Sequence, residues 1–273
     1  MLLALERLFK NVALLLIDKN YRKYIFLTLS IGGKKRYKRC KVSINNTKVD
    51  VLDNRSFLAQ YLEIFFQRSY QFTSSKDSPL IIDCGANIGT SVLFFKSIYP
   101  QCRIKAFEPD PIVYQVLSDN IDRHNYSDVE VINQAVWTEE TTLNFASDGS
   151  DAGTITDTIN NNTIAVKAID LNNYLNDLGE NIDMLKIDIE GAEYDVVLNC
   201  SQALRRVDNL FVECHSFPGQ KQRIHQILKL LEDLDFRYYI QNENSRKSPF
   251  INRSKEKIMD MQLNIYAYRE QNQ

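Results

Sequence analysis

Between residues 80 and 215, short apolar runs alternate with segments whose apolar residues recur every three or four positions. The short runs predict core strands, because polar or glycine residues bound them and they are too short for helices. The spacing between them predicts helices that pack on these strands. This alternation is typical of an α/β domain with a mostly parallel sheet and helices on both faces. The predicted core strands are 80–83, 103–107, 129–136, 184–187 and 210–214.

Two pairs of predicted strands depart from this alternation. Residues 141–145 and 163–168 predict strands around a polar loop with no helix between them, which indicates an added hairpin near the mouth of a site. Residues 236–240 and 261–268 also follow one another without a helix. They therefore predict an antiparallel hairpin at the edge of the main sheet.

The first 75 residues predict an accessory α+β extension. A strand is expected over 24–31, a hairpin over 42–51 and a helix over 55–66. The polar stretch 73–79 is the expected boundary. We therefore divide the chain into an accessory region, 1–75, and a main domain, 76–273.

A helix is also predicted over residues 1–17, and its apolar residues share one face: Leu5, Leu8, Phe9, Val12, Leu15 and Leu16. We expect this face to dock on the protein. Contact with a membrane surface or with a partner protein is the alternative. Apolar runs in the chain stay below the 18 residues that a membrane span needs, so we expect no transmembrane segment.

Composition narrows the class of protein. The formal net charge of the 273 residues is -2, which argues against a general nucleic-acid binder because there is no basic excess to meet phosphates. The five cysteines are odd in number and lack C-x-x-C spacing. They favour a reducing compartment, the cytoplasm, and neither disulfides nor a zinc site.

Ionisable side chains follow four of the predicted strands, at Asp83, Glu108, Asp188 with Glu190, and His215. Ligands of open α/β sheets bind outside the carboxyl ends of the strands, so we expect these groups to share one crevice. After Asp83, Gly85 and Gly89 lead into a helix. Such a turn lets the backbone approach a nucleotide beside free N–H groups of the helix.

The acids indicate which nucleotide is bound. Glu108 is placed to accept hydrogen bonds from both hydroxyls of an adenosine ribose. Asp83 can hold the ammonium end of an amino-acid-like cofactor, directly or through water. Gln134 and Ala135, in the third predicted strand, would lie beside the base. An acid at position 83 and the missing third glycine argue against a nicotinamide-dependent oxidoreductase, which we retain only as a remote alternative.

Five segments together resemble the FkbM family of methyltransferases: D-C-G-A-N-I-G at 83–89, F-E-P-D-P at 107–111, N-Q-A-V at 133–136, L-K-I-D-I-E-G-A-E at 185–193 and E-C-H at 213–215. The resemblance implies the Rossmann-like, doubly wound fold of S-adenosylmethionine-dependent enzymes. It also implies O-methylation of a hydroxyl on a sugar, a glycan or a hydroxylated small molecule. On this basis we assign cofactor contacts to Asp83, Gly85, Ala86, Asn87, Gly89, Glu108, Pro109, Gln134, Ala135 and Asp188.

A protonated hydroxyl is a poor nucleophile, so a general base should assist methyl transfer. His215 is the first choice, because histidine titrates near neutral pH. Asp188 or Glu190 is the alternative base, and this pair could instead orient the acceptor or bind a divalent cation. The sequence does not require a metal, and we assign no metal ligand. A non-catalytic, methyltransferase-like binding module is the main alternative to an enzyme.

Overall fold

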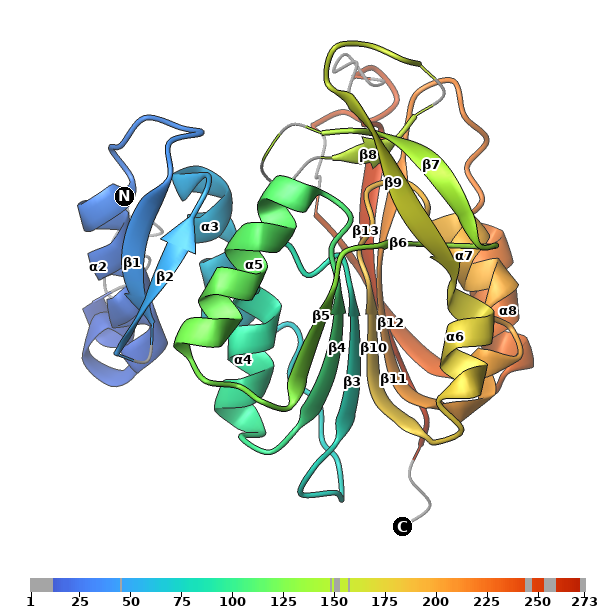
Figure 1. The fold of residues 1–273 in the computed structure, drawn as a ribbon, viewed down its shortest axis with the longest axis horizontal. Coiled ribbons are helices and arrows are strands. Elements are labelled where there is room, and N and C mark those ends of the chain that lie inside the picture. The colour runs from blue at the N-terminus through green and yellow to red at the C-terminus, as the bar shows by residue number, and fades with distance from the viewer. Residues whose placement is uncertain are drawn as a thin grey trace.

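The computed structural model describes residues 12–44, 46–147, 149, 153–156, 158–243, 247–252 and 259–270. Seven strands form the main sheet, in the order β12-β13-β11-β10-β3-β4-β5 (Figure 1). Strands β11, β10, β3, β4 and β5 are parallel, and β13 is antiparallel to both of its neighbours. The bounds are β3 Leu80–Cys84, β4 Arg103–Phe107, β5 Val129–Ile132, β10 Ile182–Ile187, β11 Val207–Ser216, β12 Arg237–Asn242 and β13 Met261–Tyr268.

This order confirms the predicted Rossmann-like sheet and its antiparallel edge hairpin. From β3 the chain continues to β4 and β5 on one side, whereas β10 and β11 lie on the other side. The strand order therefore reverses between β3 and β10. A crevice forms at such a switch point, outside the carboxyl ends of the strands, and this is where open α/β sheets bind their ligands.

Helices cover both faces of the sheet (Figure 1). One face carries α4 Thr90–Ile98 and α5 Pro111–Arg123, and the other carries α6 Leu171–Asp177, α7 Glu193–Asn199 and α8 Ile224–Asp233, with a short 3₁₀ turn at Ala203–Arg206. The sequence starts α5 as predicted. Asp110 caps the helix by accepting hydrogen bonds from the N–H groups of Ile112 and Val113, and Pro111 occupies the first turn.

A second sheet lies beyond the carboxyl ends of the main strands (Figure 1). Its order is β6-β9-β7-β8, with β6 Ala135–Trp137, β7 Thr141–Ala146, β8 Thr154–Ile155 and β9 Thr163–Asp170. The predicted hairpin is confirmed, since β7 and β9 pair antiparallel. The predicted strand 129–136, however, is two strands in different sheets. The Asn133 amide bonds the carbonyl oxygens of Glu108 and Pro109, which holds the chain at the break between them.

The accessory region contains α2 Lys19–Ile31, β1 Cys40–Ile44, β2 Thr47–Val51, α3 Asn54–Tyr61 and a π-helical turn, Leu62–Phe66. The predicted hairpin and second helix are confirmed. The predicted strand over 24–31 is wrong, because this segment is the second half of α2. Leu27 and Ile31, four residues apart, are its buried residues. A short, largely apolar run does not distinguish a buried strand from a buried helix.

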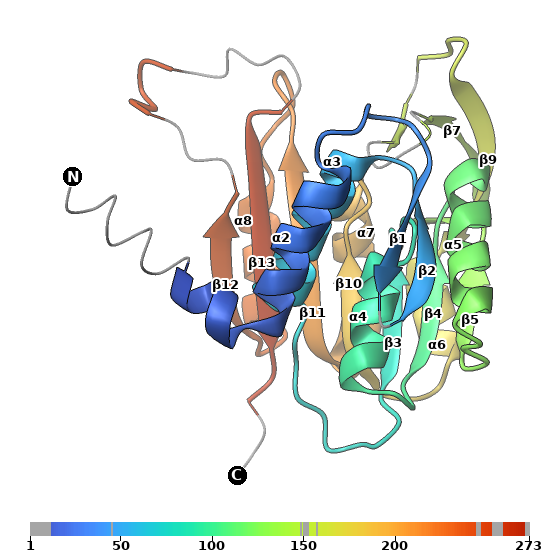
Figure 2. The ribbon, with the colours of Figure 1, turned by 90° about the vertical axis from the view of Figure 1, so that its left-hand side faces the viewer.

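The accessory elements pack on the α4 side of the main sheet (Figure 2). The rings of Phe65 and of Phe94 in α4 form a T-shaped contact with their centroids 5.5 Å apart, and the two residues belong to one hydrophobic core. The division of the chain at residue 75 stays a prediction. The accessory region is nevertheless positioned by this core, so it can contribute side chains to the crevice.

Much of the predicted first helix, residues 1–11, lies outside the described residues. Residues 12–17 are helical, and the three residues of the predicted apolar face that fall in this part are exposed: Val12 by 46%, Leu15 by 36% and Leu16 by 78%. The expected docking is therefore wrong for this part of the helix. In the described part of the chain, we find no helix with the length and apolarity that crossing a membrane requires.

Candidate functional site

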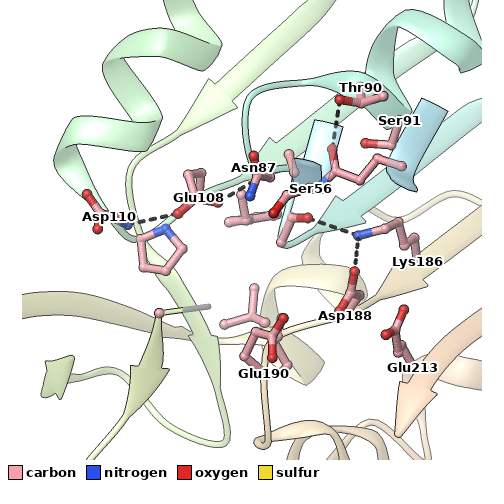
Figure 3. A pocket seen from close by; sticks show the side chains of 18 of the residues that line it. Ser56, Asn87, Thr90, Ser91, Glu108, Asp110, Lys186, Asp188, Glu190 and Glu213 are labelled. Atoms are coloured by element: carbon pink, nitrogen blue, oxygen red, sulfur yellow. Dashed lines mark hydrogen bonds and ion pairs between the residues drawn. The ribbon is translucent and has the colours of Figure 1, made fainter. Parts of the chain in front are cut away.

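A cavity of about 470 Å³ opens at the switch point of the main sheet (Figure 3). Segments that follow β3, β4 and β10 form its wall, together with β6 and the end of β11. The accessory region closes one side through α3 and the π-helical turn. Most of the strand-end groups predicted from the sequence line this cavity: Gly85, Ala86, Asn87, Glu108, Pro109, Gln134, Ala135, Asp188 and Glu190.

The two glycines after β3, Gly85 and Gly89, have different surroundings. Gly85 lines the cavity with φ of +83°, and a Cβ there would lie 1.8 Å from the carbonyl oxygen of Asp188. Only glycine therefore allows the turn after β3 to lie this close to the end of β10. Gly89, with φ of +92°, faces the Leu117 side chain of α5 and does not line the cavity. Gly89 was predicted to contact a cofactor, but the structure places it in a packing position at the start of α4.

Glu108 is fixed at one end of the cavity by the backbone (Figure 3). One carboxylate oxygen accepts from the N–H of Asn87 and the other from the N–H of Asp110, each at 3.0 Å. Burial raises the pKa of Glu108 to about 8, although these two hydrogen bonds favour the charged form. Its remaining lone pairs are available to a ligand with two adjacent hydroxyl groups.

Beyond Glu108, the cavity wall is mainly apolar. Gln134 and Ala135 are placed there as predicted, and Val136, Phe145 and Ile155 extend the surface. Phe145 belongs to the second sheet, whose β7 strand was predicted as part of a hairpin at the mouth. A flat, apolar group such as a nucleoside base would be covered by this surface.

Asp83 does not reach the cavity. Its side chain is completely buried, accepts a hydrogen bond from Ser91 and lies 3.3 Å from the ammonium of Lys186. Lys186 does line the cavity, donates to the carbonyl oxygen of Gly85 at 2.9 Å and lies 3.4 Å from Asp188. Burial lowers the pKa of Lys186, but the charges of Asp83 and Asp188 outweigh it and raise that pKa. Asp83 therefore acts on the cavity through Lys186, a residue that the sequence analysis missed.

His215 is also absent from the cavity wall. Its ring is buried beneath Glu190 and Glu213, with Nε2 3.6 Å and 3.5 Å from their carboxylates, and Nδ1 lies 2.9 Å from Glu193. Burial opposes its charge, but the hydrogen bonds to Glu193 and Glu213 raise the pKa of His215 to about 12. An imidazole that already carries two protons cannot accept another. This geometry does not favour His215 as the general base.

Acidic side chains gather at the end of the cavity away from Glu108 (Figure 3). They are Glu63, Asp188, Glu190 and Glu213. Burial and, after it, the charge of Glu213 raise the pKa of Glu63 to about 8, and burial with the charge of Asp188 raises that of Glu190 to about 8. Burial and Glu213 also raise the pKa of Asp188. A cluster of carboxylates that raise one another's pKa suits a cationic ligand.

Two of these acids were not assigned from the sequence. Glu63 comes from the π-helical turn of the accessory region, and its spacing gave no sign that it faces a site across the chain. Glu213 was noted only as part of a family motif. Glu190 was assigned, and its backbone adds support because φ is +57°, in the left-handed region. A non-glycine residue held in that conformation often marks a functional position.

Comparison with known proteins shows that this chain is similar to methyltransferases. The family model described as the methyltransferase FkbM domain matches residues 83–238. "Methyltransferase 1" of Beauveria bassiana is 30% identical over 175 residues, 55% of this chain and 70% of that protein. "2-O-methyltransferase NoeI" of Sinorhizobium fredii is 24% identical over 155 residues, 50% of this chain and 64% of that protein. The solved SAM-dependent methyltransferase of Agrobacterium tumefaciens shares the fold, with a TM-score of 0.52, 7% identity and coverage of 88% of this chain and 72% of that one.

Proposed function

This chain belongs to the FkbM family of methyltransferases, and from that premise we propose that it uses S-adenosylmethionine to methylate a hydroxyl of a sugar, a glycan or a hydroxylated small molecule. The cavity carries the proposal, because it combines a ribose-binding acid with a cluster of carboxylates at the opposite end. The donor has both kinds of group that these ends suit. It contains a ribose, and its sulfonium and ammonium groups are cationic.

In this proposal the donor runs along the switch point. Its ribose hydroxyls bond Glu108, and its adenine lies on the apolar surface beside Gln134 and Ala135. The methionyl carboxylate suits Lys186, whose ammonium is held at the cavity wall by Asp83 and the Gly85 carbonyl. The sulfonium then lies toward the acids, where its charge is stabilised and the methyl group faces the rest of the cavity.

The acceptor would enter from the side closed by the accessory region. Ser56, Gln60 and Glu63 line that side and supply hydroxyl, amide and carboxyl groups. Such groups suit an acceptor rich in hydroxyls. Oxygen as the methylated atom is also supported by the name of the Sinorhizobium relative, a 2-O-methyltransferase.

Transfer is an in-line displacement, in which alignment of the acceptor oxygen, the methyl carbon and the sulfur can supply about 7–11 kcal/mol of barrier lowering. We assign the general base to Glu190, because its carboxylate lines the cavity whereas His215 is covered. His215 then acts as a positioning residue beneath the acids.

The proposal is tested by incubating the protein with S-adenosylmethionine labelled in its methyl group and a panel of sugars, glycolipids and hydroxylated products. We expect one acceptor class to gain label, with an equal amount of S-adenosylhomocysteine released. A protein that binds the donor but yields neither product with any acceptor would instead be a methyltransferase-like binding module. Failure to bind the donor at all in calorimetry would contradict the cofactor assignment.

Binding of the donor should depend on pH through Glu108. Because burial raises its pKa to about 8, this carboxyl is protonated below that pH and loses acceptor capacity for the ribose. The dissociation constant should rise by up to tenfold for each pH unit below about 8. The α-amino group of the donor titrates in the same range, at about 7.7–8.0 for an ordinary α-amine. Calorimetry on Glu108→Gln, which removes this titration and keeps those of the donor, Glu63 and Glu190, should show a flatter profile, and equal slopes in both proteins would contradict the prediction.

A further inference from the structure

Two acids that line the acidic end of the cavity and the histidine buried beneath them are arranged as metal ligands. Asp188, Glu213 and His215 each offer one ligand atom, and these atoms lie within 4.8 Å of one another. We propose that they bind one divalent metal ion, Mn²⁺ or Mg²⁺, which holds the acceptor oxygen during methyl transfer. The ligand set stands on the geometry alone, whereas the role in transfer rests on the proposed function.

Strand register brings the three ligands together. In the parallel pair of β10 and β11, Ile187 is opposite Val212, so Asp188 emerges beside Glu213. Glu213 and His215 are two residues apart on β11 and therefore point to the same face of the sheet. The neighbouring β13 adds Gln262, which donates a hydrogen bond to Glu213 and helps fix its carboxylate.

His215 is oriented as metal-binding histidines usually are. The acid Glu193 is completely buried beside it, with one carboxylate oxygen 2.9 Å from Nδ1, and the N–H groups of Ile189 and Gly191 also donate to that acid. A carboxylate on Nδ1 keeps the proton on that nitrogen and points Nε2 toward the metal. Nε2 is directed at the cluster and lies 3.5 Å from Glu213 and 3.6 Å from Glu190. A metal ion would displace the proton of Nε2, because a ligating histidine is neutral.

The charges at this end of the cavity also favour a cation. Asp188, Glu190 and Glu213 lie together, and Glu63 adds a fourth acid from the accessory region. Lys186 is 3.3 Å from Asp83 and 3.4 Å from Asp188, so its charge is shared with a buried acid outside the cluster. A divalent ion would relieve the remaining repulsion between these acids.

Ligand type selects the ion. Carboxylates favour Mg²⁺ and Mn²⁺, whereas imidazole favours later transition metals, so a set of two carboxylates and one imidazole suits Mn²⁺ well. Three protein ligands also leave coordination positions for water or for the acceptor. The described cluster contains no thiolate, which would have favoured Zn²⁺.

The metal would act on the acceptor as a Lewis acid. A hydroxyl oxygen bound to the ion becomes more acidic, and its proton passes to the carboxylate of Glu190. The oxygen electron pair forms the bond to the methyl carbon, while the carbon–sulfur bond breaks and its electron pair stays on sulfur. The products are the methyl ether, a protonated Glu190 and the neutral thioether S-adenosylhomocysteine, so atoms and charge balance.

Direct metal binding tests the site. The full chain is stripped with a chelator and titrated with Mn²⁺, and free Mn²⁺ is followed by electron paramagnetic resonance in the absence of donor. We expect one Mn²⁺ per chain and at least about tenfold weaker binding in Glu213→Gln and in His215→Ala. Glu130→Gln, which changes an exposed acid on β5 that does not line the cavity, should keep the affinity of the parent protein. Thermal melts establish that each variant is folded.

Methyl transfer gives the second readout. Chelation should abolish label transfer, and added Mn²⁺ or Mg²⁺ should restore it. Absence of stoichiometric Mn²⁺ binding, or equal affinity in the parent and both ligand variants, would overturn the proposal, and so would full transfer in the presence of chelator. The binding measurement omits the donor, so failure of the proposed function would be seen separately, as absent S-adenosylmethionine binding in calorimetry.

Discussion

Replacement of Glu108 by Ala should weaken binding of S-adenosylmethionine by about 10²-fold or more, because two hydrogen bonds to a charged acceptor are worth about 1.5–3 kcal/mol each. The substitution removes the proposed acceptor for the ribose and also removes the hydrogen-bond partner of the N–H groups of Asn87 and Asp110. The turn after β3 should therefore loosen at the point where it approaches the donor. Calorimetry at a pH above 8, where the parent carboxyl is ionised, measures the loss directly.

Glu130→Ala provides the matched control for this experiment. Glu130 is an exposed acid on β5, the strand next to the β4 strand that Glu108 follows. It pairs with Lys105 outside the cavity. Loss of a surface ion pair costs about 0–1 kcal/mol of stability and should leave donor affinity unchanged. If Glu108→Ala and Glu130→Ala bound the donor equally well, the ribose would not lie on Glu108.

Replacement of Glu190 by Gln should lower kcat by about 10²–10⁴-fold, the usual contribution of a general base. Gln has nearly the same shape but cannot take the acceptor proton. Donor affinity should change little, because the proposed ribose and adenine sites are at the other end of the cavity. Steady-state kinetics with a labelled donor, combined with calorimetry on the same preparation, separates the two effects.

A second variant guards against an effect of the backbone. Glu190 has φ of +57°, a conformation that glycine adopts without strain. Glu190→Gly should therefore fold at least as well as the parent protein and be as inactive as Glu190→Gln. Near-parent turnover in both variants would move the base to Asp188, the remaining candidate. A large loss in Glu190→Gln with recovery in Glu190→Gly would indicate that the backbone, and not the carboxylate, governs the rate.

The accessory region has a role that its sequence did not indicate. Its helix α3 and π-helical turn share a core with α4 and bring Glu63 into the acidic end of the cavity. Glu63 lies 3.4 Å from the Asn264 amide of β13, so one acid joins segments 201 residues apart in the chain. A π-helical turn inside a helix often occurs at a functional site. This region therefore completes the cavity and is the expected source of acceptor specificity.

The sequence by itself determined the frame of the site. Alternating strands and helices required a mostly parallel sheet, and acids at successive strand ends had to meet along one edge of it. Asp110 with Pro111 started a helix where the pattern predicted one. Glu108, Asp188 and Glu190 line the cavity for the same reason. Glu108 and Asp188 directly follow strands whose direction the apolar pattern had already defined, and Glu190 comes two residues after Asp188.

Only the tertiary structure decided which strand-end groups are accessible. Asp83 ends its strand as predicted, yet Ser91 and Lys186 enclose it, and His215 is enclosed by three acids from two segments. The apolar run at 24–31 became a helix because its buried face packs on the π-helical turn and α3. Periodicity records which face of a segment is buried. Accessibility, by contrast, depends on neighbours that arrive from distant parts of the chain, and no local pattern specifies them.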